Sequence, residues 1–199
     1  MIKKRLGLTL LLVLMSGLCW ADTWELDLSA GTSHISGGIH YKSFLDTGYL
    51  KVGGTGVVTD DDDTEYKWGS LDVTAGSDTL RPGLNIDIGL RGLLGKAEEP
   101  GVSGDVGAVG FTTAAGYLFP SDVFPIPLEI FGSLTWAPRP LSFRDTENIF
   151  EINLGIGLRL IKNASIIASY SYYHLEMESD TADWSINDDV FKAGLMLRF

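Results

Sequence analysis

Three histidines and a run of aspartates are the residues of this chain whose types could perform acid–base chemistry. General acid–base catalysis needs a histidine that a carboxylate orients and that lies within hydrogen-bond reach of its target. His174 and the Asp60–Asp63 run fall at the same predicted end of the fold, so a contact between them is geometrically feasible. No spacing here matches a nucleophile motif, and we therefore expect no enzyme. The candidate set is His34, His40, His174, Ser36, Glu176 and Asp60–Asp63.

The aspartate run does not have the pattern of a calcium loop. In an EF-hand that began at Asp60, the sixth position would be glycine and the twelfth a glutamate, but they are Glu65 and Leu71. Adjacent aspartates repel one another, so a solvated loop is predicted. The single cysteine, Cys19, supplies neither an internal disulfide nor a thiolate cluster. The sequence predicts no metal site and no cofactor.

A second group of ionisable residues lies on the polar face of the predicted strands and is expected to point into a narrow lumen. Five are basic and four are acidic, which predicts paired charges rather than a lining of one sign. If the first and last strands of the fold are neighbours, Glu25 or Asp27 is expected to pair with Arg198. The group is Glu25, Asp27, Lys51, Asp87, Arg91, Glu151, Arg159, Lys192 and Arg198.

The element that positions these charges is the β-strand. Between Phe150 and Leu160 every second residue is apolar, while the residues between them are polar or glycine. Strands place successive side chains on opposite faces, so this period of two gives one apolar face and one polar face. About ten segments show it, each long enough for a tilted membrane strand. They run over 23–30, 33–43, 48–58, 66–75, 84–94, 107–118, 127–137, 147–160, 164–178 and 188–199.

The N-terminus has the pattern of a secretory signal peptide. Lys3, Lys4 and Arg5 precede an apolar run from Leu6 to Met15, and a small residue, Ala21, ends the segment. Cleavage after Ala21 would leave 178 of the 199 residues, without cysteine, and would change the net charge from −11 to −14 because three basic residues are lost. No later apolar run is long enough for a membrane-spanning helix. A negative charge of this size also argues against a nucleic-acid partner.

Alternation fits both a soluble barrel and a membrane barrel turned inside out. The export signal and the last segment favour the membrane. The chain ends on an aromatic residue that apolar residues precede at every second position, which resembles the C-terminal signal of outer-membrane barrels. Because a barrel in lipid can leave no open edge, the last strand must pair with the first. The expected assembly signal, read by the barrel-assembly machinery, is Phe191, Leu195, Leu197 and Phe199.

The connections and the aromatic residues extend this prediction. Alternate connections would be extracellular, generally the longer and more acidic set: Gly31–Thr32, Thr59–Glu65, Gly95–Val106, Pro138–Thr146 and Ser179–Asn187. The periplasmic turns would be Phe44–Thr47, Gly76–Gly83, Phe119–Ile126 and Ile161–Asn163. Aromatic girdles are expected at the inner ends from Trp24, Phe44, Tyr49, Tyr117, Phe119 and Phe199, and nearer the outer ends from Trp68, Trp136, Tyr172 and Phe191.

The stretch from Gly83 to Phe199 resembles the YfaZ family of outer-membrane proteins of Gram-negative bacteria. The resemblance lies in Gly83–Ile86, in the glycine-spaced strand near 107–117, in Trp136–Pro138 with Leu141–Phe143 and Asp145, in Leu154–Arg159, and in the tyrosine-rich 169–175. It implies an integral outer-membrane barrel, often labelled a porin. It carries over no catalytic or binding residue.

The expected fold is thus a single antiparallel transmembrane β-barrel of about ten strands, or alternatively eight, formed by residues 22–199. About eight strands enclose a space that side chains fill, whereas 16–18 leave an aqueous channel, so a ten-stranded lumen would be narrow. We expect a porin-like protein for small solutes in the bacterial outer membrane. The alternative is a non-conducting structural or surface-interaction barrel. The expected partners are outer-membrane lipid and lipopolysaccharide.

Overall fold

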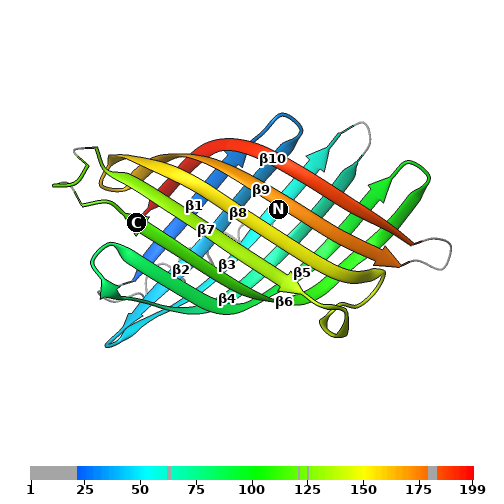
Figure 1. Cartoon of the computed structure of the whole chain (residues 1–199), viewed down its shortest axis with the longest axis horizontal. Coiled ribbons are helices and arrows are strands. Elements are labelled where there is room, and N and C mark those ends of the chain that lie inside the picture. Colours follow the sequence, from blue (N-terminus) through cyan, green and yellow to red (C-terminus); the bar gives the residue numbers. More distant parts are fainter. Residues whose placement is uncertain (1–21, 62–63, 121, 125, 179–182) are drawn as a thin grey trace, which may run out of the picture.

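The computed structural model describes residues 22–199 apart from 62–63, 121, 125 and 179–182. The predicted signal peptide, residues 1–21, lies outside the described residues. The described chain forms one closed barrel of ten strands (Figure 1). The strands are β1 (Thr23–Ala30), β2 (His34–Leu45), β3 (Gly48–Asp60), β4 (Glu65–Arg81), β5 (Leu84–Glu99), β6 (Val102–Leu118), β7 (Leu128–Ala137), β8 (Thr146–Ile161), β9 (Ala164–Glu178) and β10 (Asp183–Arg198).

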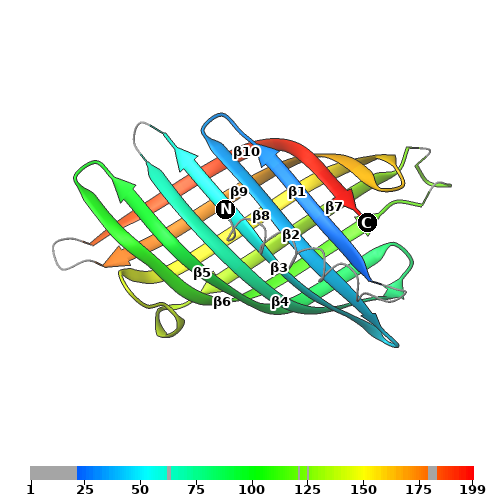
Figure 2. The same ribbon diagram turned by 180° about the vertical axis from the view of Figure 1, so that it is seen from behind.

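Every strand pairs antiparallel with its neighbours, and β1 pairs with β10 to close the barrel. Figure 2 shows β1 lying between β10 and β2 on the side that faces the viewer. The closing register sets Glu25 opposite Arg198 and Leu28 opposite Leu195. The all-β barrel and its ten strands are therefore confirmed, and the eight-stranded alternative is wrong. No helix in the described residues is long and apolar enough to span a membrane.

Both ends of the described chain lie at one end of the barrel, called here the near end. At this end the Trp24 N–H donates to the Phe199 carbonyl at 2.9 Å, and the Phe199 N–H donates to the Trp24 carbonyl at 2.8 Å. The connections β1–β2, β5–β6 and β7–β8 lie at the opposite end, called the far end. The short 3₁₀-helix η1 (Arg139–Leu141) forms part of the β7–β8 connection.

Several strands are longer than the sequence predicts. The expected loop Gly95–Val106 is mostly strand and forms the far-end hairpin of β5 and β6. The expected turn Gly76–Gly83 is also largely strand, since β4 continues to Arg81. Backbone pairing continues where side-chain alternation fades, because the hydrogen bonds of a ladder do not depend on which face is apolar. The prediction that the extracellular connections are longer than the periplasmic turns is only partly correct. The near-end connection 119–127 is longer than the far-end connection 138–145.

The two faces of the barrel wall are chemically opposite around its waist. Large apolar side chains point outward, among them Phe191 at 75 % and Leu71 at 73 % exposure. Charged side chains such as Asp72, Asp87 and Lys192 point inward and are buried. A belt of exposed aliphatic side chains around a polar interior is the arrangement of a membrane barrel.

At the far end this arrangement reverses. Tyr173, Leu175 and Met177 of β9 are buried inside the barrel, while His174 and Glu176 between them lie on the outside. The far end of β5 shows the same pattern, because Ala97 is buried inside the barrel and the residues on either side of it are exposed. A polar outside and an apolar inside are what water requires, so the far end projects beyond the lipid and is packed like a soluble barrel.

Candidate functional site

The near half of the lumen holds a connected set of charges. Arg198 of β10 donates to Glu25 of β1 at 3.4 Å and to Glu129 of β7 at 2.9 Å. Lys51 of β3 lies 3.2 Å from Glu25, and Arg159 of β8 lies 3.6 Å from Glu129. Two carboxylates are thus shared among three cations whose strands surround the lumen.

A second charge cluster crosses the lumen nearer the middle of the barrel. Arg91 of β5 binds both Asp72 of β4 and Glu151 of β8, the latter at 2.9 Å. His40 of β2 stands between Asp27 at 3.7 Å and Asp72 at 3.5 Å. Charges withdrawn from bulk water must be paired with one another, and these contacts supply the pairing. Together the two clusters tie strands from opposite sides of the barrel.

The predicted lumen charges can now be placed one by one. The expected pairing of Glu25 with Arg198 is present, whereas Asp27 contacts His40. Asp87 accepts a hydrogen bond from the Tyr49 hydroxyl. Lys192, only 6 % exposed, donates to the Tyr173 hydroxyl at 3.4 Å.

Sequence reasoning missed two acids of these clusters, Asp72 and Glu129. Both had the signal used for the others, since Asp72 lies between Leu71 and Val73, and Glu129 lies between Leu128 and Ile130. With them, the near-balance of five basic and four acidic residues becomes five basic and six acidic. His40, considered above for catalysis, belongs to the same lumen network.

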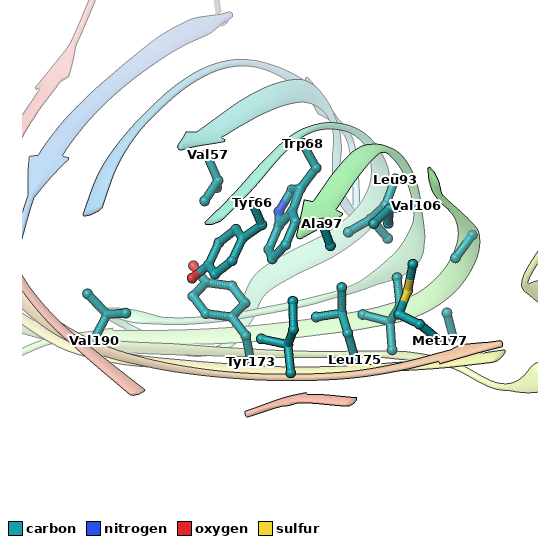
Figure 3. Close-up of a cluster of buried hydrophobic side chains, with 14 residues drawn as sticks. Val57, Tyr66, Trp68, Leu93, Ala97, Val106, Tyr173, Leu175, Met177 and Val190 are labelled. Carbon is teal, nitrogen blue, oxygen red and sulfur yellow. The ribbon is translucent and has the colours of Figure 1, made fainter. Parts of the chain in front are cut away.

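Apolar side chains fill the far half of the lumen. The rings of Tyr66 and Trp68 stack with centroids 4.1 Å apart, and Tyr173 approaches Trp68 edge-on at 5.5 Å (Figure 3). Tyr66 is 1 % exposed and Ile186 is fully buried. We call this set the aromatic plug. Its members are Val57, Tyr66, Trp68, Leu93, Ala97, Val106, Ala108, Ala137, Ile149, Tyr173, Leu175, Met177, Ile186 and Val190.

A few polar groups are embedded in the aromatic plug. The Tyr66 hydroxyl donates to Asp188 at 2.6 Å, and His34 Nδ1 lies 2.8 Å from the Thr59 hydroxyl. His34 also stacks on Tyr173 with the ring centroids 5.8 Å apart. The plug was not expected from the sequence. In β9 the apolar residues change from even to odd positions after Tyr172, but alternation alone does not show that the odd positions face the interior.

The candidate acid–base residues are not brought together. His174 lies on the outer wall, with Nδ1 2.7 Å from Asn187 and Nε2 3.3 Å from Glu176. Asp61 instead accepts a hydrogen bond from Ser33 at 3.3 Å, and Ser36 bonds to Ser29 inside the barrel. Asp62 and Asp63 lie outside the described residues. Within the described part of the chain, no three His, Cys, Asp or Glu residues are arranged to hold a metal ion.

The aromatic girdles are partly as predicted. Trp24 packs on Tyr41 at the near end, and Trp136 is exposed on the outer wall. Tyr49 and Trp68 were assigned to the girdles, but both are buried in the lumen, so that assignment is wrong for them. In each case the residue lies on the inward parity of its strand, and parity outweighs position along the strand.

No protein-family model matches the chain, and neither does any curated protein sequence. Solved barrels resemble it distantly. The NanC porin is 12 % identical with a TM-score of 0.45, covering 89 % of this chain and 99 % of that one. A KdgM porin in complex with disordered oligogalacturonate is 8 % identical with a TM-score of 0.43, covering 89 % and 98 %. The N-terminal β-barrel domain of Pseudomonas aeruginosa OprF is 13 % identical with a TM-score of 0.34, covering 89 % and 96 %.

Proposed function

We propose that this protein is an integral outer-membrane β-barrel whose lumen is closed in its resting form, and that it serves a structural or surface-interaction role. The aromatic plug carries this proposal. Its stacked rings and fully buried aliphatic side chains support a closed far half, because packed apolar side chains exclude water.

The outer-membrane placement is part of the proposal. It combines the predicted signal peptide, the lipid-facing belt and the resemblance to the YfaZ family. In this placement the far end is extracellular. Phe199 and the outward-facing Phe191, Leu195 and Leu197 would act as the assembly signal for the barrel-assembly machinery.

Planar-bilayer recording tests the closed lumen. The purified mature protein is expected to give no stable large conductance, and liposomes that contain it should not swell in small sugars. A steady conductance from the unmodified protein would contradict the proposal. Insertion is verified separately by protease protection of the reconstituted barrel, so that a bilayer without inserted protein is not mistaken for one that contains a closed barrel.

A narrow solute path is the second candidate function. One observation favours it: in the near half, the side chains of Lys51 and Arg159 retain partial exposure, so solvent reaches the charge clusters from that end. If the aromatic plug moved, the solvent-accessible near half of the lumen would connect with the far end. Swelling that appears only under an applied condition such as membrane potential would support this second function.

A further inference from the structure

Four basic side chains at the far end do not point into the lumen, and three of them gather in one place. Arg139 is held between Glu147 at 2.6 Å and Glu178 at 2.7 Å. The other three line a surface pocket of about 530 Å³ on the outside of β4, β5 and β6. They are Lys67, Lys96 and Arg144, called here the rim cluster.

The two lysines of the rim cluster face each other across neighbouring strands. In the β4–β5 register Lys67 lies directly opposite Lys96, and both side chains are on the exposed outer face. Like charges directly opposite each other destabilise a sheet. An anion between the two ammonium groups would remove this repulsion.

Arg144 reaches the same face through an unusual backbone conformation. Its φ is +61°, a left-handed conformation that is costly for a residue other than glycine. The Phe143 N–H donates to the Gly107 carbonyl at 2.9 Å, which fastens the β7–β8 connection to β6. Arg144 Cδ lies 3.1 Å from the point that a Cβ on Gly107 would occupy. The fastened connection holds the arginine over the outer wall and compensates for the cost of its backbone conformation.

The rim cluster lies at the border of the lipid-facing belt. Leu94 is exposed two residues before Lys96 on the same face of β5, which is about 7 Å along the strand. Phe143, whose ring lies against Gly107 beside Arg144, is exposed at this border. Aromatic and basic side chains at such a level are typical of the headgroup region of a membrane.

Three carboxylates share the pocket with its three cations, so the formal net charge of the pocket is zero. Glu65 pairs with Lys67, and Glu98 and Asp105 also line the pocket. Neither Lys96 nor Arg144 forms an ion pair in the described part of the chain. Two cations therefore remain available to an incoming anion, and one of them is a planar guanidinium, which binds phosphate with two parallel hydrogen bonds.

We propose that Lys67, Lys96 and Arg144 bind a phosphate group of a lipid headgroup in the leaflet that surrounds the far end. This inference rests on the proposed outer-membrane placement, in which that leaflet is the outer one and the phosphorylated lipid is the lipid A portion of lipopolysaccharide. It does not depend on whether the lumen is closed.

Lipid binding to the refolded mature protein in detergent tests the proposal. Native mass spectrometry compares lipid A carrying two phosphates with the same lipid after dephosphorylation. The unmodified protein should prefer the phosphorylated lipid by about tenfold or more. The triple variant Lys67→Gln/Lys96→Gln/Arg144→Gln should lose this preference, and Arg139→Gln/Lys162→Gln, which also removes basic residues, should keep it. Lys96→Gln alone, on an exposed face, gives an intermediate preference if the triple variant folds poorly.

Three results would overturn the proposal: equal binding of both lipids by the unmodified protein, an undiminished preference in the triple variant, or displacement of lipid A by millimolar inorganic phosphate, which would indicate a site for soluble anions. Circular dichroism and heat-dependent gel migration verify folding in every sample. Failure of the folded protein to insert into liposomes would instead contradict the proposed function, so the two failures can be told apart.

Discussion

Arg198 and Glu129 face each other across the near half of the lumen, where Nη2 of the arginine lies 2.9 and 3.0 Å from the two carboxylate oxygens. Neither residue lies on a strand adjacent to the other's, since β9 and β8 separate β10 from β7. The contact therefore braces the barrel across its interior rather than along its wall. It also links the C-terminal strand to the middle of the chain.

Removal of one partner of this contact should destabilise the barrel. Arg198→Ala leaves Glu129 and Glu25 without a shared cation, and we expect a loss of about 3 kcal/mol in the free energy of unfolding. Glu129→Gln keeps an acceptor and should cost about 1 kcal/mol. Urea unfolding of the refolded protein in lipid vesicles measures both. Lys162→Gln, in the β8–β9 turn, is the control, and an equal effect there would mean that lumen pairing contributes nothing.

Loss of the aromatic plug should open the lumen. Tyr66→Ala/Trp68→Ala removes the stacked pair, and we expect stepwise conductance in planar bilayers where the unmodified protein shows none. The same variant should lose at least about 3 kcal/mol of stability because a large cavity replaces packed rings. Trp136→Ala, on the outer wall, should leave the conductance unchanged. If the double variant folds but shows no conductance, residues other than Tyr66 and Trp68 close the lumen.

Gly155 makes room for a ring in the lumen. A Cβ there would collide with the ring of Phe131 on the adjacent strand β7. Gly155→Ala should therefore cost about 1–3 kcal/mol by overpacking. In the Phe131→Ala background the same change should cost much less, so the two substitutions are coupled. Gly56→Ala is the matched control, because nothing lies within 4 Å of its Cβ position. Thermal unfolding of the four proteins gives the coupling directly, and strict additivity would contradict it.

Phe199 should matter more for assembly in cells than for the stability of the finished barrel. Its backbone bonds to Trp24 close the sheet and do not require the ring. We expect Phe199→Ala to lower the amount of folded barrel in the outer membrane several-fold while refolding in detergent is nearly unaffected. Phe124→Ala, an exposed ring in the β6–β7 connection, is the control. If Phe199→Ala and the unmodified protein give equal amounts of folded barrel in cells, Phe199 is not part of the assembly signal.

The absence of catalysis also stays a prediction. His174 is hydrogen-bonded to Asn187 and Glu176 on the outer wall, and in the described residues no serine or cysteine side chain is hydrogen-bonded to it. His174→Ala should leave hydrolase and acyltransferase assays on lipid substrates at the background of empty vesicles, as should the unmodified protein. Activity above background that the substitution abolishes would reverse this assignment.

The amino-acid sequence by itself determined the barrel strands, because period-two alternation separates an apolar face from a polar face on each strand. The pairing of Glu25 with Arg198 followed from closure of the sheet, since the first strand and the last must be neighbours. Only the tertiary structure decided which cations share Glu129 and that His40 stands between two aspartates, because contacts across a lumen depend on the stagger of all ten strands together. It also decided the closure of the far half. Alternation is the same whether the apolar residues face lipid or the interior, so Tyr66 and Trp68 became a plug only once the barrel was seen to extend beyond the membrane.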